Sequence, residues 1–222
     1  MNLRIAIIVL VLFLSLDAAA QGSLPVKTWS GNADSTYVLL ISGDGGLNNF
    51  TSNLCADINS AGYPLSAVNA KSYFWEKKTP EQTTADILLF LRGQKANKSN
   101  FHLCLLGYSF GADVVPYIVN RFPDSIKERL SSVILLSPSG STDFEIHWSD
   151  MLGGKTKRSM DVVTEINRMN VKKVALLSGD EEAGLPAHAI HLPNCAIEKL
   201  PGGHHFDGNT GVIAGAMMKY IN

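Results

Sequence analysis

Three short segments, far apart along the chain, carry the side chains that hydrolysis at a serine requires. Ser109 is the central residue of Gly-Tyr-Ser-Phe-Gly at 107–111, and the acidic run Asp-Glu-Glu occupies 180–182. Gly-Gly-His-His follows at 202–205. A serine hydroxyl is a weak nucleophile at neutral pH, so it needs a histidine base that an acidic side chain orients. Serine, acid and histidine occur here in the chain order of α/β-hydrolases.

The segment around Ser109 predicts a nucleophile elbow, which is a sharp turn from a strand into a helix. The apolar run 101–106 comes before it, and a helical pattern follows it. Gly107 and Gly111 lack Cβ atoms, so the strand and the helix can close on the turn and leave the serine at its apex. The hydroxyl would then lie above a helix N-terminus, where backbone N–H groups stabilise an oxyanion.

An oxyanion hole requires two N–H donors near the serine. The amide of Phe110, directly after the serine, is the expected first donor. The second is expected from Asp44 or Gly45, in the glycine-rich loop that follows the apolar segment 37–41. This loop is not a phosphate-binding P-loop, because no Gly-Lys-Ser or Gly-Lys-Thr follows it.

The histidine and the acid each have neighbouring alternatives. His204 comes directly after the Gly-Gly turn and is the preferred base, while His205 is expected to point toward the opposite side. Glu182 is the preferred acid, because it stands three residues after the glycine that ends the preceding apolar segment. Asp180, which is closer to that segment, is the alternative, and Glu181 is the third candidate. Two of the three acids are expected to be solvated loop residues.

The first 20 residues are typical of a secretory signal peptide. Arg4 precedes an apolar run at 5–16, and an Ala-x-Ala site ends at Ala20. The apolar run is shorter than the roughly 20 residues that an ordinary membrane span needs. We therefore expect cleavage after Ala20 and an exported mature chain, 21–222, that forms one domain with a substantial core.

The composition excludes several classes of function. The formal net charge is −1 and the sequence has no basic block, so nucleic-acid partners are not expected. No cysteine or histidine spacing is typical of a metal site, and we expect neither a metal nor another cofactor. Cys55, Cys104 and Cys195 are too few for a disulfide scaffold, and the sequence leaves open whether two of them form a bridge.

Apolar segments alternate with helical patterns along the mature chain, which predicts an α/β-hydrolase fold with a mostly parallel sheet flanked by helices. The predicted strands are 37–41, 65–70, 101–106, 133–136, 171–177 and 195–200. The predicted helices are 50–61, 80–91, 110–121, 161–169 and 209–221. Residues 22–35 are expected to form a polar lead-in, and 139–157 an insertion that serves as a small lid or pocket wall.

Four blocks of the sequence resemble the bacterial VirJ/AcvB virulence-protein family. They are Ser-Gly-Asp-Gly-Gly at 42–46, Ser-Tyr-Phe-Trp at 72–75 with Thr-Pro-Glu at 79–81, Gly-Tyr-Ser-Phe-Gly-Ala-Asp at 107–113, and Pro-Gly-Gly-His-His-Phe-Asp-Gly at 201–208. The resemblance implies an exported hydrolase, periplasmic in Gram-negative bacteria. It implies hydrolysis of the aminoacyl ester of aminoacylated phosphatidylglycerol, such as the lysyl lipid, at the membrane surface. For some members it also implies type IV secretion components as partners.

This substrate class suggests residues that contact it. A lysyl group is positively charged, and Asp44, Glu145 or Asp207 is expected to receive it, although each of them is by default ordinary surface charge. Trp75 and Tyr108 are expected to line the substrate site, but aromatic side chains more commonly cap the core.

Two other functions remain open from the sequence. One is a generic carboxylesterase or thioesterase that uses the same triad on a small soluble ester. The other is a non-catalytic periplasmic binding or chaperone protein of a secretion system, with a vestigial hydrolase fold. The complete order of serine, acid and histidine favours an enzyme, because a binding protein has no need for all three.

Overall fold

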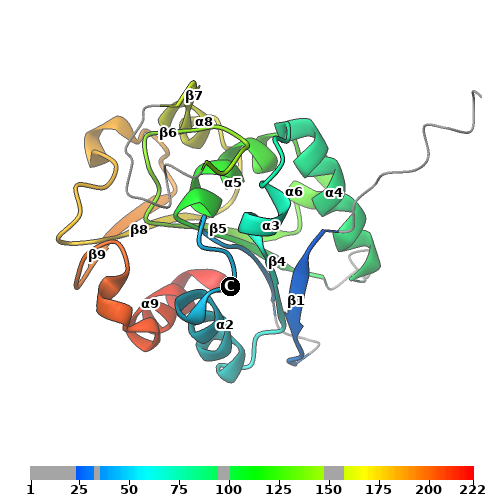
Figure 1. Ribbon diagram of the computed structural model, residues 1–222, viewed down its shortest axis with the longest axis horizontal. Helices are drawn as coiled ribbons and strands as arrows, with labels where there is room; N and C mark the ends of the chain where they lie inside the picture. Colours follow the sequence, from blue (N-terminus) through cyan, green and yellow to red (C-terminus); the bar gives the residue numbers. More distant parts are fainter. Residues whose placement is uncertain (1–23, 33–35, 95–100, 148–157) are drawn as a thin grey trace, which may run out of the picture.

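A seven-stranded sheet, in the order β1-β3-β2-β4-β5-β8-β9, forms the centre of the molecule (Figure 1). The computed structural model describes residues 24–32, 36–94, 101–147 and 158–222, so the expected signal peptide and part of the expected insertion lie outside the described residues. The strands are β1 (Val26–Trp29), β2 (Tyr37–Ile41), β3 (Leu65–Val68), β4 (Leu103–Tyr108), β5 (Leu130–Leu136), β8 (Val174–Gly179) and β9 (Cys195–Leu200). Every neighbouring pair except β1 and β3 is parallel, which confirms the predicted mostly parallel sheet.

Helices cover both faces of the sheet (Figure 1). One face carries α2 (Asn49–Ser60) and α9 (Thr210–Ile221), and the other carries α3 (Ala70–Tyr73), α4 (Pro80–Gly93), α5 (Phe110–Asn120) and α8 (Val162–Asn167), with the short α6 (Asp124–Lys127) after α5. In β2, Leu39 and Ile41 pack into the core on the α5 side, while Val38 and Leu40 pack on the α9 side. Successive side chains of a strand point to opposite faces, so a strand covered on both faces is apolar at every position.

Local sequence signals fix where the helices begin. The Thr79 side chain accepts a hydrogen bond from the amide of Gln82 at 3.1 Å, and the Gln82 side chain accepts one from the amide of Thr79 at 2.9 Å. This capping box starts α4, with Pro80 at the first position, where a missing N–H costs nothing. Asn209 caps α9 in the same way by accepting from the amide of Val212 at 3.3 Å.

The sequence patterns do not predict several short elements, among them β1, α3, α6, β6 (Ser141–Thr142) and β7 (Met160–Asp161). β1 is an edge strand whose two middle residues are exposed, so it lacks an apolar pattern and belongs to the expected polar lead-in. α3 is a single turn, and β6 and β7 form a pair too short to leave a periodic signal. None of the helices that the structure describes is long and apolar enough to cross a membrane.

Six neighbouring strands, β3, β2, β4, β5, β8 and β9, end at the same edge of the sheet because they run parallel. β4 and β8 each continue two residues beyond their predicted ends, because backbone pairing persists where the apolar pattern stops. Ser109 and the acidic run 180–182 follow directly after β4 and β8, and the histidine pair 204–205 lies in the loop after β9. Loops at the carboxyl ends of parallel strands form the ligand sites of such sheets.

Candidate active site

Ser109 occupies the turn between β4 and α5. Its φ of 52° and ψ of −119° lie outside the regions that residues with a side chain normally adopt, as in a nucleophile elbow. The amide of Ser109 donates to the carbonyl of Leu136 at 2.8 Å, and its own carbonyl accepts from the amide of Asp113 at 3.1 Å. The neighbouring strand and the first turn of the helix therefore hold the strained residue in place.

Three glycines let the backbone close around Ser109. A Cβ atom at Gly107 would collide with the carbonyl of Gly111, and a Cβ atom at Gly111 would collide with the carbonyl of Ile41 at the end of β2. A Cβ atom at Gly43 would lie 3.3 Å from the Cβ of Ser109. The elbow glycines thus allow α5 to approach β4 and β2, and the loop after β2 lies against the serine.

A continuous chain of hydrogen bonds connects the serine, a histidine and an acid. Oγ of Ser109 lies 2.8 Å from Nε2 of His204, and Nδ1 of His204 lies 2.9 Å from Oε2 of Glu182. With the ring proton on Nδ1, the imidazole donates to the carboxylate and accepts from the serine hydroxyl. Among the alternatives that the sequence left open, the structure brings these three side chains together.

The carboxyl group of Glu182 is held ionised by its surroundings. Its Oε1 accepts hydrogen bonds from the hydroxyl of Ser137 at 2.5 Å and from the amide of Gly179 at 2.9 Å. Partial burial raises the pKa of Glu182, but the hydrogen bonds from His204, Ser137 and Gly179 outweigh it and lower the pKa to about 2. At neutral pH Glu182 is therefore a carboxylate, which can accept the Nδ1 proton of His204 and so orient the imidazole.

The other two acids of the run have a different place. Oδ1 of Asp180 accepts a hydrogen bond from the amide of Gly202 at 2.9 Å, and the amide of Glu181 donates to the carbonyl of Gly202 at 3.2 Å. Both side chains are exposed. We call residues 201–205, between β9 and the turn before α9, the histidine loop. The Asp180 side chain therefore binds the backbone of this loop, whereas only Glu182 of the acidic run is hydrogen-bonded to a histidine ring.

His205 lies against Tyr108 instead of Ser109. The Tyr108 hydroxyl is 2.6 Å from Nδ1 of His205 and 3.3 Å from the carbonyl oxygen of His204, and the ring of Tyr108 stacks on that of His204 with 5.9 Å between centroids. Tyr108 is only 3% exposed, and burial raises the pKa of its hydroxyl, so it stays neutral. The prediction that Tyr108 lines the substrate site does not fit this burial, because its side chain packs beneath the histidine loop and supports it.

The residues expected to form the oxyanion hole lie on two elements beside Ser109. Phe110 is the first residue of α5, and the first amides of a helix have no intrahelical acceptor. The loop 43–46 is closed by a 2.9 Å hydrogen bond between its first and last residues, which puts Asp44 and Gly45 at its tip. Asp44 is half-buried and Gly45 is exposed. The first amide of α5 thus follows the serine directly, and the glycine loop packs against the serine at Gly43.

Trp75 lies near the elbow, because Phe74, the residue before it, packs against the first residue of α5. The ring of Phe74 packs edge-on against the ring of Phe110, with 5.0 Å between centroids, and Trp75 follows it with 45% of its surface exposed. The carbonyl of Phe74 accepts from the amide of Ile146 at 2.9 Å, so the segment that contains Glu145 lies beside the same turn. Trp75 and Glu145 are thus both carried by segments next to the elbow helix.

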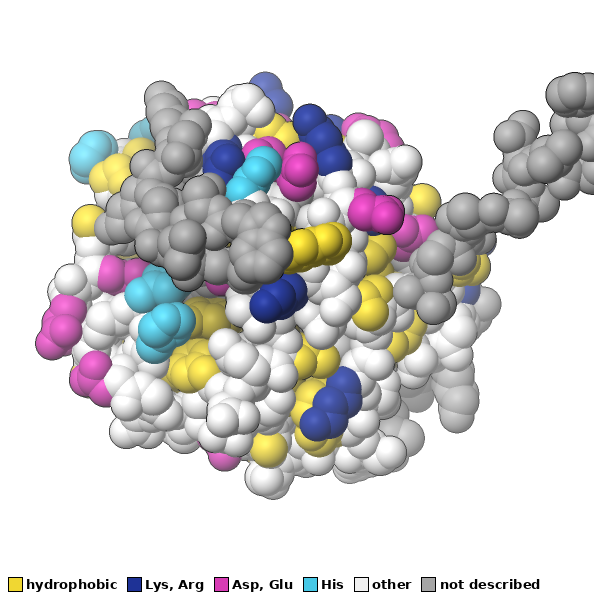
Figure 2. Space-filling model, viewed as in Figure 1, with side chains coloured by type: hydrophobic (Ala, Val, Ile, Leu, Met, Phe, Trp, Pro, Cys, Tyr) yellow, Lys and Arg dark blue, Asp and Glu magenta, His cyan; other side chains and the backbone are white. Residues whose placement is uncertain are grey.

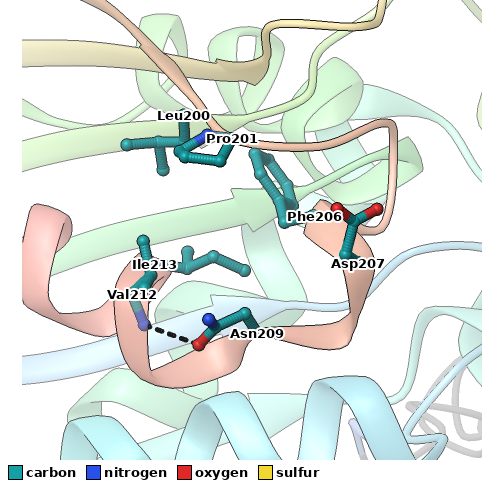
Figure 3. A pocket seen from close by; sticks show the side chains of 7 residues that line it. All are labelled: Leu200, Pro201, Phe206, Asp207, Asn209, Val212 and Ile213. Carbon is teal, nitrogen blue, oxygen red and sulfur yellow. Dashed lines mark hydrogen bonds between the residues drawn. The ribbon is translucent and has the colours of Figure 1, made fainter.

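Asp207 lies at a small cavity behind the histidine loop. This cavity of about 110 Å³ forms where the end of β9 meets the start of α9 (Figure 3). Its lining consists of Leu200, Pro201, Phe206, Asp207, Asn209, Val212 and Ile213, and so contains no member of the hydrogen-bonded triad. Asp207 has a φ of 51° and packs against Gly202. The structure therefore gives the expected substrate contact of Asp207 no direct support.

The loop after β8, which carries the acids 180–182 and is called the acid loop here, packs closely against the histidine loop. Nζ of Lys199 donates to the carbonyls of Gly179 and Glu182, both at 2.9 Å. A Cβ atom at Gly179 would collide with the carbonyls of Gly202 and Gly203, so only glycine permits this contact. The close packing of the two loops and the two hydrogen bonds from Lys199 together set the distance between Glu182 and His204.

Sequence reasoning missed three residues that support this site: Ser137, Asp113 and Lys199. Ser137 follows directly after β5 and, like Ser109, has a positive φ, of 52°. Its sequence signal is a polar turn, Ser-Pro-Ser-Gly, at the carboxyl end of a central apolar strand. Asp113 and Lys199 lie within a helix and a strand, where a single charged residue gives no comparable signal.

The side chains around the triad, as far as the structure describes them, form neither a metal-binding cluster nor a disulfide. Figure 2 shows histidine, acidic and hydrophobic side chains close together on one face of the molecule. Within the ranges that the structure describes, no three His, Cys, Asp or Glu side chains are arranged to hold a metal ion. Cys55, Cys104 and Cys195 are free thiols, and burial raises the pKa of the first two to about 12, so they stay protonated.

Comparison with known proteins identifies the family. The model of the family described as "Bacterial virulence protein (VirJ)" matches residues 34–222, which is most of the chain. The chain belongs to the VirJ family. A search of curated proteins gives no match.

Solved structures establish the fold of this VirJ-family protein. A lipase-esterase related protein from Clostridium acetobutylicum has a TM-score of 0.62 at 15% identity, over 89% of this chain and 99% of the other. Naproxen esterase from Bacillus subtilis has a TM-score of 0.61 at 18% identity, over 89% and 87%. Est1E from Butyrivibrio proteoclasticus has a TM-score of 0.60 at 15% identity, over 88% and 91%. The chain has the α/β-hydrolase fold.

Proposed function

We propose that this VirJ-family protein is a serine hydrolase that cleaves a carboxylic ester through a covalent acyl-enzyme. The observation that carries the proposal is the unbroken chain from Ser109 through His204 to Glu182, with separations of 2.8 and 2.9 Å. These distances lie within the range in which a base accepts a proton from a nucleophile. The strained backbone of Ser109 adds to this support, because such strain is stored mainly at functional sites.

The reaction follows from this arrangement. His204 takes the proton of the Ser109 hydroxyl as Oγ attacks the ester carbonyl, and the Glu182 carboxylate stabilises the imidazolium that forms. The amide of Phe110 and an amide of the loop 43–46 stabilise the oxyanion. His204 then gives its proton to the leaving alkoxide, which leaves an acyl group on Ser109. A water molecule, deprotonated by His204, hydrolyses this acyl-enzyme and restores the serine.

For the substrate we propose the aminoacyl ester of aminoacylated phosphatidylglycerol, with the lysyl lipid as the first candidate. Membership of the VirJ family supports this choice, as does the carboxylate of Asp44 on the loop that packs against Ser109. An aminoacyl ester is activated toward attack, because the ammonium group beside the carbonyl withdraws electrons. We further propose that the mature protein acts in the periplasm, where it can reach lipid at the membrane surface.

The test is hydrolysis of lysyl-phosphatidylglycerol in phosphatidylglycerol vesicles by the purified mature chain. Release of free lysine is measured by mass spectrometry, with Ser109→Ala as the blank and a p-nitrophenyl ester as a second substrate. We expect lysine release by the wild type alone. Cleavage of the p-nitrophenyl ester without lysine release would favour a generic carboxylesterase. If neither substrate is cleaved by folded protein, the serine-hydrolase proposal fails.

The role of Asp44 can be tested in the same assay. An alanyl lipid lacks the side-chain ammonium group, so the ratio of lysine to alanine release reports recognition of that charge. We expect Asp44→Asn to lower this ratio, by up to roughly fivefold because one partly exposed ion pair contributes about 0–1 kcal/mol. The preference should also weaken as salt rises. An unchanged ratio in Asp44→Asn would assign recognition of the amino acid to another residue.

A further inference from the structure

Asp113 is a buried acid that the proposed reaction does not use. It lies in the first turn of α5 with 7% of its surface exposed. Its two carboxylate oxygens accept hydrogen bonds from the amide of Ser139 at 2.6 Å and from the hydroxyl of Ser139 at 2.7 Å. No lysine or arginine among the described residues forms an ion pair with it. Burial raises the pKa of Asp113 to about 7, although the bonds from Ser139 act in the opposite direction. A buried carboxyl group without a cationic partner costs stability, so its presence here calls for an explanation.

The bonds of Asp113 hold the turn that follows β5. Ser137 starts this turn with a φ of 52°, and its amide donates to the carbonyl of Leu177 at 2.7 Å. Its hydroxyl reaches across to Oε1 of Glu182 at 2.5 Å. A residue other than glycine keeps such a backbone conformation only where its surroundings hold it there. Two residues further on, the two bonds from Ser139 to Asp113 anchor the far side of the turn.

Asp113 thereby connects the two ends of the triad. Its amide donates to the carbonyl of Ser109 at 3.1 Å, and its carboxylate holds the turn that presents Ser137 to Glu182. The helix α5, which begins directly after Ser109, therefore also holds the turn from which Ser137 bonds to Glu182. Without the anchor, the turn can relax, and Oε1 of Glu182 loses the short hydrogen bond that sets the orientation of the carboxylate.

We propose that Asp113 is a positioning residue, which acts through the turn 137–139 to hold Glu182 in the orientation that receives Nδ1–H of His204. This proposal rests on the proposed serine-hydrolase function. It predicts that loss of Asp113 and loss of the Ser137 hydroxyl disturb the same contact. Their effects should then overlap instead of multiplying, because non-additivity is the signature of residues that act through one interaction.

The kinetic test is a double-mutant cycle of Asp113→Ala and Ser137→Ala, measured as the rate constant of labelling by a fluorophosphonate probe. Each single variant should be labelled about tenfold more slowly than the wild type, as expected when a catalytic group is misplaced. The double variant should be no more than about twofold slower than the slower single variant. Glu165→Ala is the matched control, because Glu165 is a buried acid whose carboxylate oxygens accept hydrogen bonds from Asn120 and Arg168 instead of from Ser139. Wild-type labelling in Asp113→Ala, or fully multiplying losses, would overturn the proposal.

A conservative variant separates positioning from a general loss of stability. In Asp113→Asn the amide oxygen can accept from the amide of Ser139, and the amide nitrogen can donate to the Ser139 hydroxyl. We expect most of the labelling rate to return, with kcat on a cleavable ester restored and KM unchanged throughout. If Asp113→Ala does not fold, Asp113→Asn combined with Ser139→Ala replaces it, because the pair keeps one bond and removes the other. A wild-type rate in that pair would contradict the proposal.

A readout without catalysis distinguishes failure of this inference from failure of the proposed function. The proton on Nδ1 of His204 gives a downfield NMR signal when the carboxylate of Glu182 accepts it. This signal should be present in the wild type, Asp113→Asn and Glu165→Ala, and weakened or shifted upfield in Asp113→Ala and Ser137→Ala. The same pattern in a chain that no probe labels would retain the positioning role and reject the hydrolase. An unchanged signal in Asp113→Ala would reject the positioning role alone.

Discussion

The carboxylate of Asp180 accepts a hydrogen bond from the amide of Gly202 at 2.9 Å, and this contact separates the roles of two neighbouring acids. Asp180 binds the backbone of the histidine loop, while Glu182 binds the ring of His204. The turn at the end of β8 therefore directs Asp180 and Glu182 to different parts of the histidine loop. One acid fixes the path of the loop and the other orients the imidazole.

The first prediction follows from this division. Glu182→Gln keeps the shape of the side chain but removes the charge that stabilises the imidazolium, so kcat should fall on the order of 10³- to 10⁴-fold. Asp180→Asn weakens one hydrogen bond at an exposed position and should cost at most about 1 kcal/mol of stability, with a small effect on kcat. Steady-state kinetics of both variants on one ester test the prediction. A larger loss in Asp180→Asn would transfer the role of the acid to that residue.

The second prediction separates the two histidines. His204→Ala should be as damaging as Ser109→Ala, and the combined variant no worse than either, because triad residues act as a unit. His205→Ala removes the 2.6 Å contact with the Tyr108 hydroxyl and should lower kcat by no more than about tenfold. Tyr108→Phe is the matched control, since it removes the same contact from the other side. Unequal effects of His205→Ala and Tyr108→Phe would mean that this contact is not what supports the loop.

The third prediction concerns the elbow glycines. Gly111→Ala places a Cβ atom on the carbonyl of Ile41 and should destabilise the protein by about 3 kcal/mol or more. Gly215→Ala is the control, because a Cβ atom there meets no atom within 4 Å in the exposed middle of α9. That substitution should stabilise by about 0.5–1 kcal/mol through helix propensity. Urea unfolding measures both. Equal stability of the two variants would show that the close approach at Gly111 is not required.

The fourth prediction is a dependence of stability on pH. The pKa of Glu182 is about 2 in the folded protein, below its ordinary value of about 4.3 in an unfolded chain. The ionised carboxyl group therefore stabilises the fold above about pH 4.3, and this contribution is lost as the pH falls toward 2. The difference in free energy of unfolding between the wild type and Glu182→Gln should be constant above about pH 5 and shrink in more acidic solution. A difference that does not change between pH 6 and pH 3 would contradict the assigned contacts.

Much of the fold and the core of the site follow from local sequence signals. The elbow is predictable because a sharp turn requires residues without a Cβ atom, and two glycines occur within five residues. The strands are predictable because burial on both faces requires continuous apolar runs. β1 escapes prediction because an edge strand with an exposed face needs no such run. The predicted ends of β4 and β8 are wrong by two residues, since backbone pairing and burial continue where the apolar pattern stops.

The remaining features depend on contacts between distant segments, which no local pattern records. The choice between Asp180 and Glu182 depends on how the acid loop meets Gly202, and both are acids in the same loop. Tyr108 stands next to the nucleophile in the sequence, yet its burial under the histidine loop is decided by residues 97 positions later. Asp113 accepts its hydrogen bonds from Ser139, which lies 26 residues later in the chain, in the turn after β5.

The central claim is that Ser109 becomes covalently modified during hydrolysis, and the most direct measurement is mass spectrometry of the intact protein and its peptides after reaction with a fluorophosphonate. The wild type should gain one adduct, located on Ser109 within the peptide that contains residues 107–111. Ser109→Ala should gain none while keeping the same thermal unfolding temperature within a few degrees. An adduct on another residue, or a labelled Ser109→Ala variant, would contradict the account.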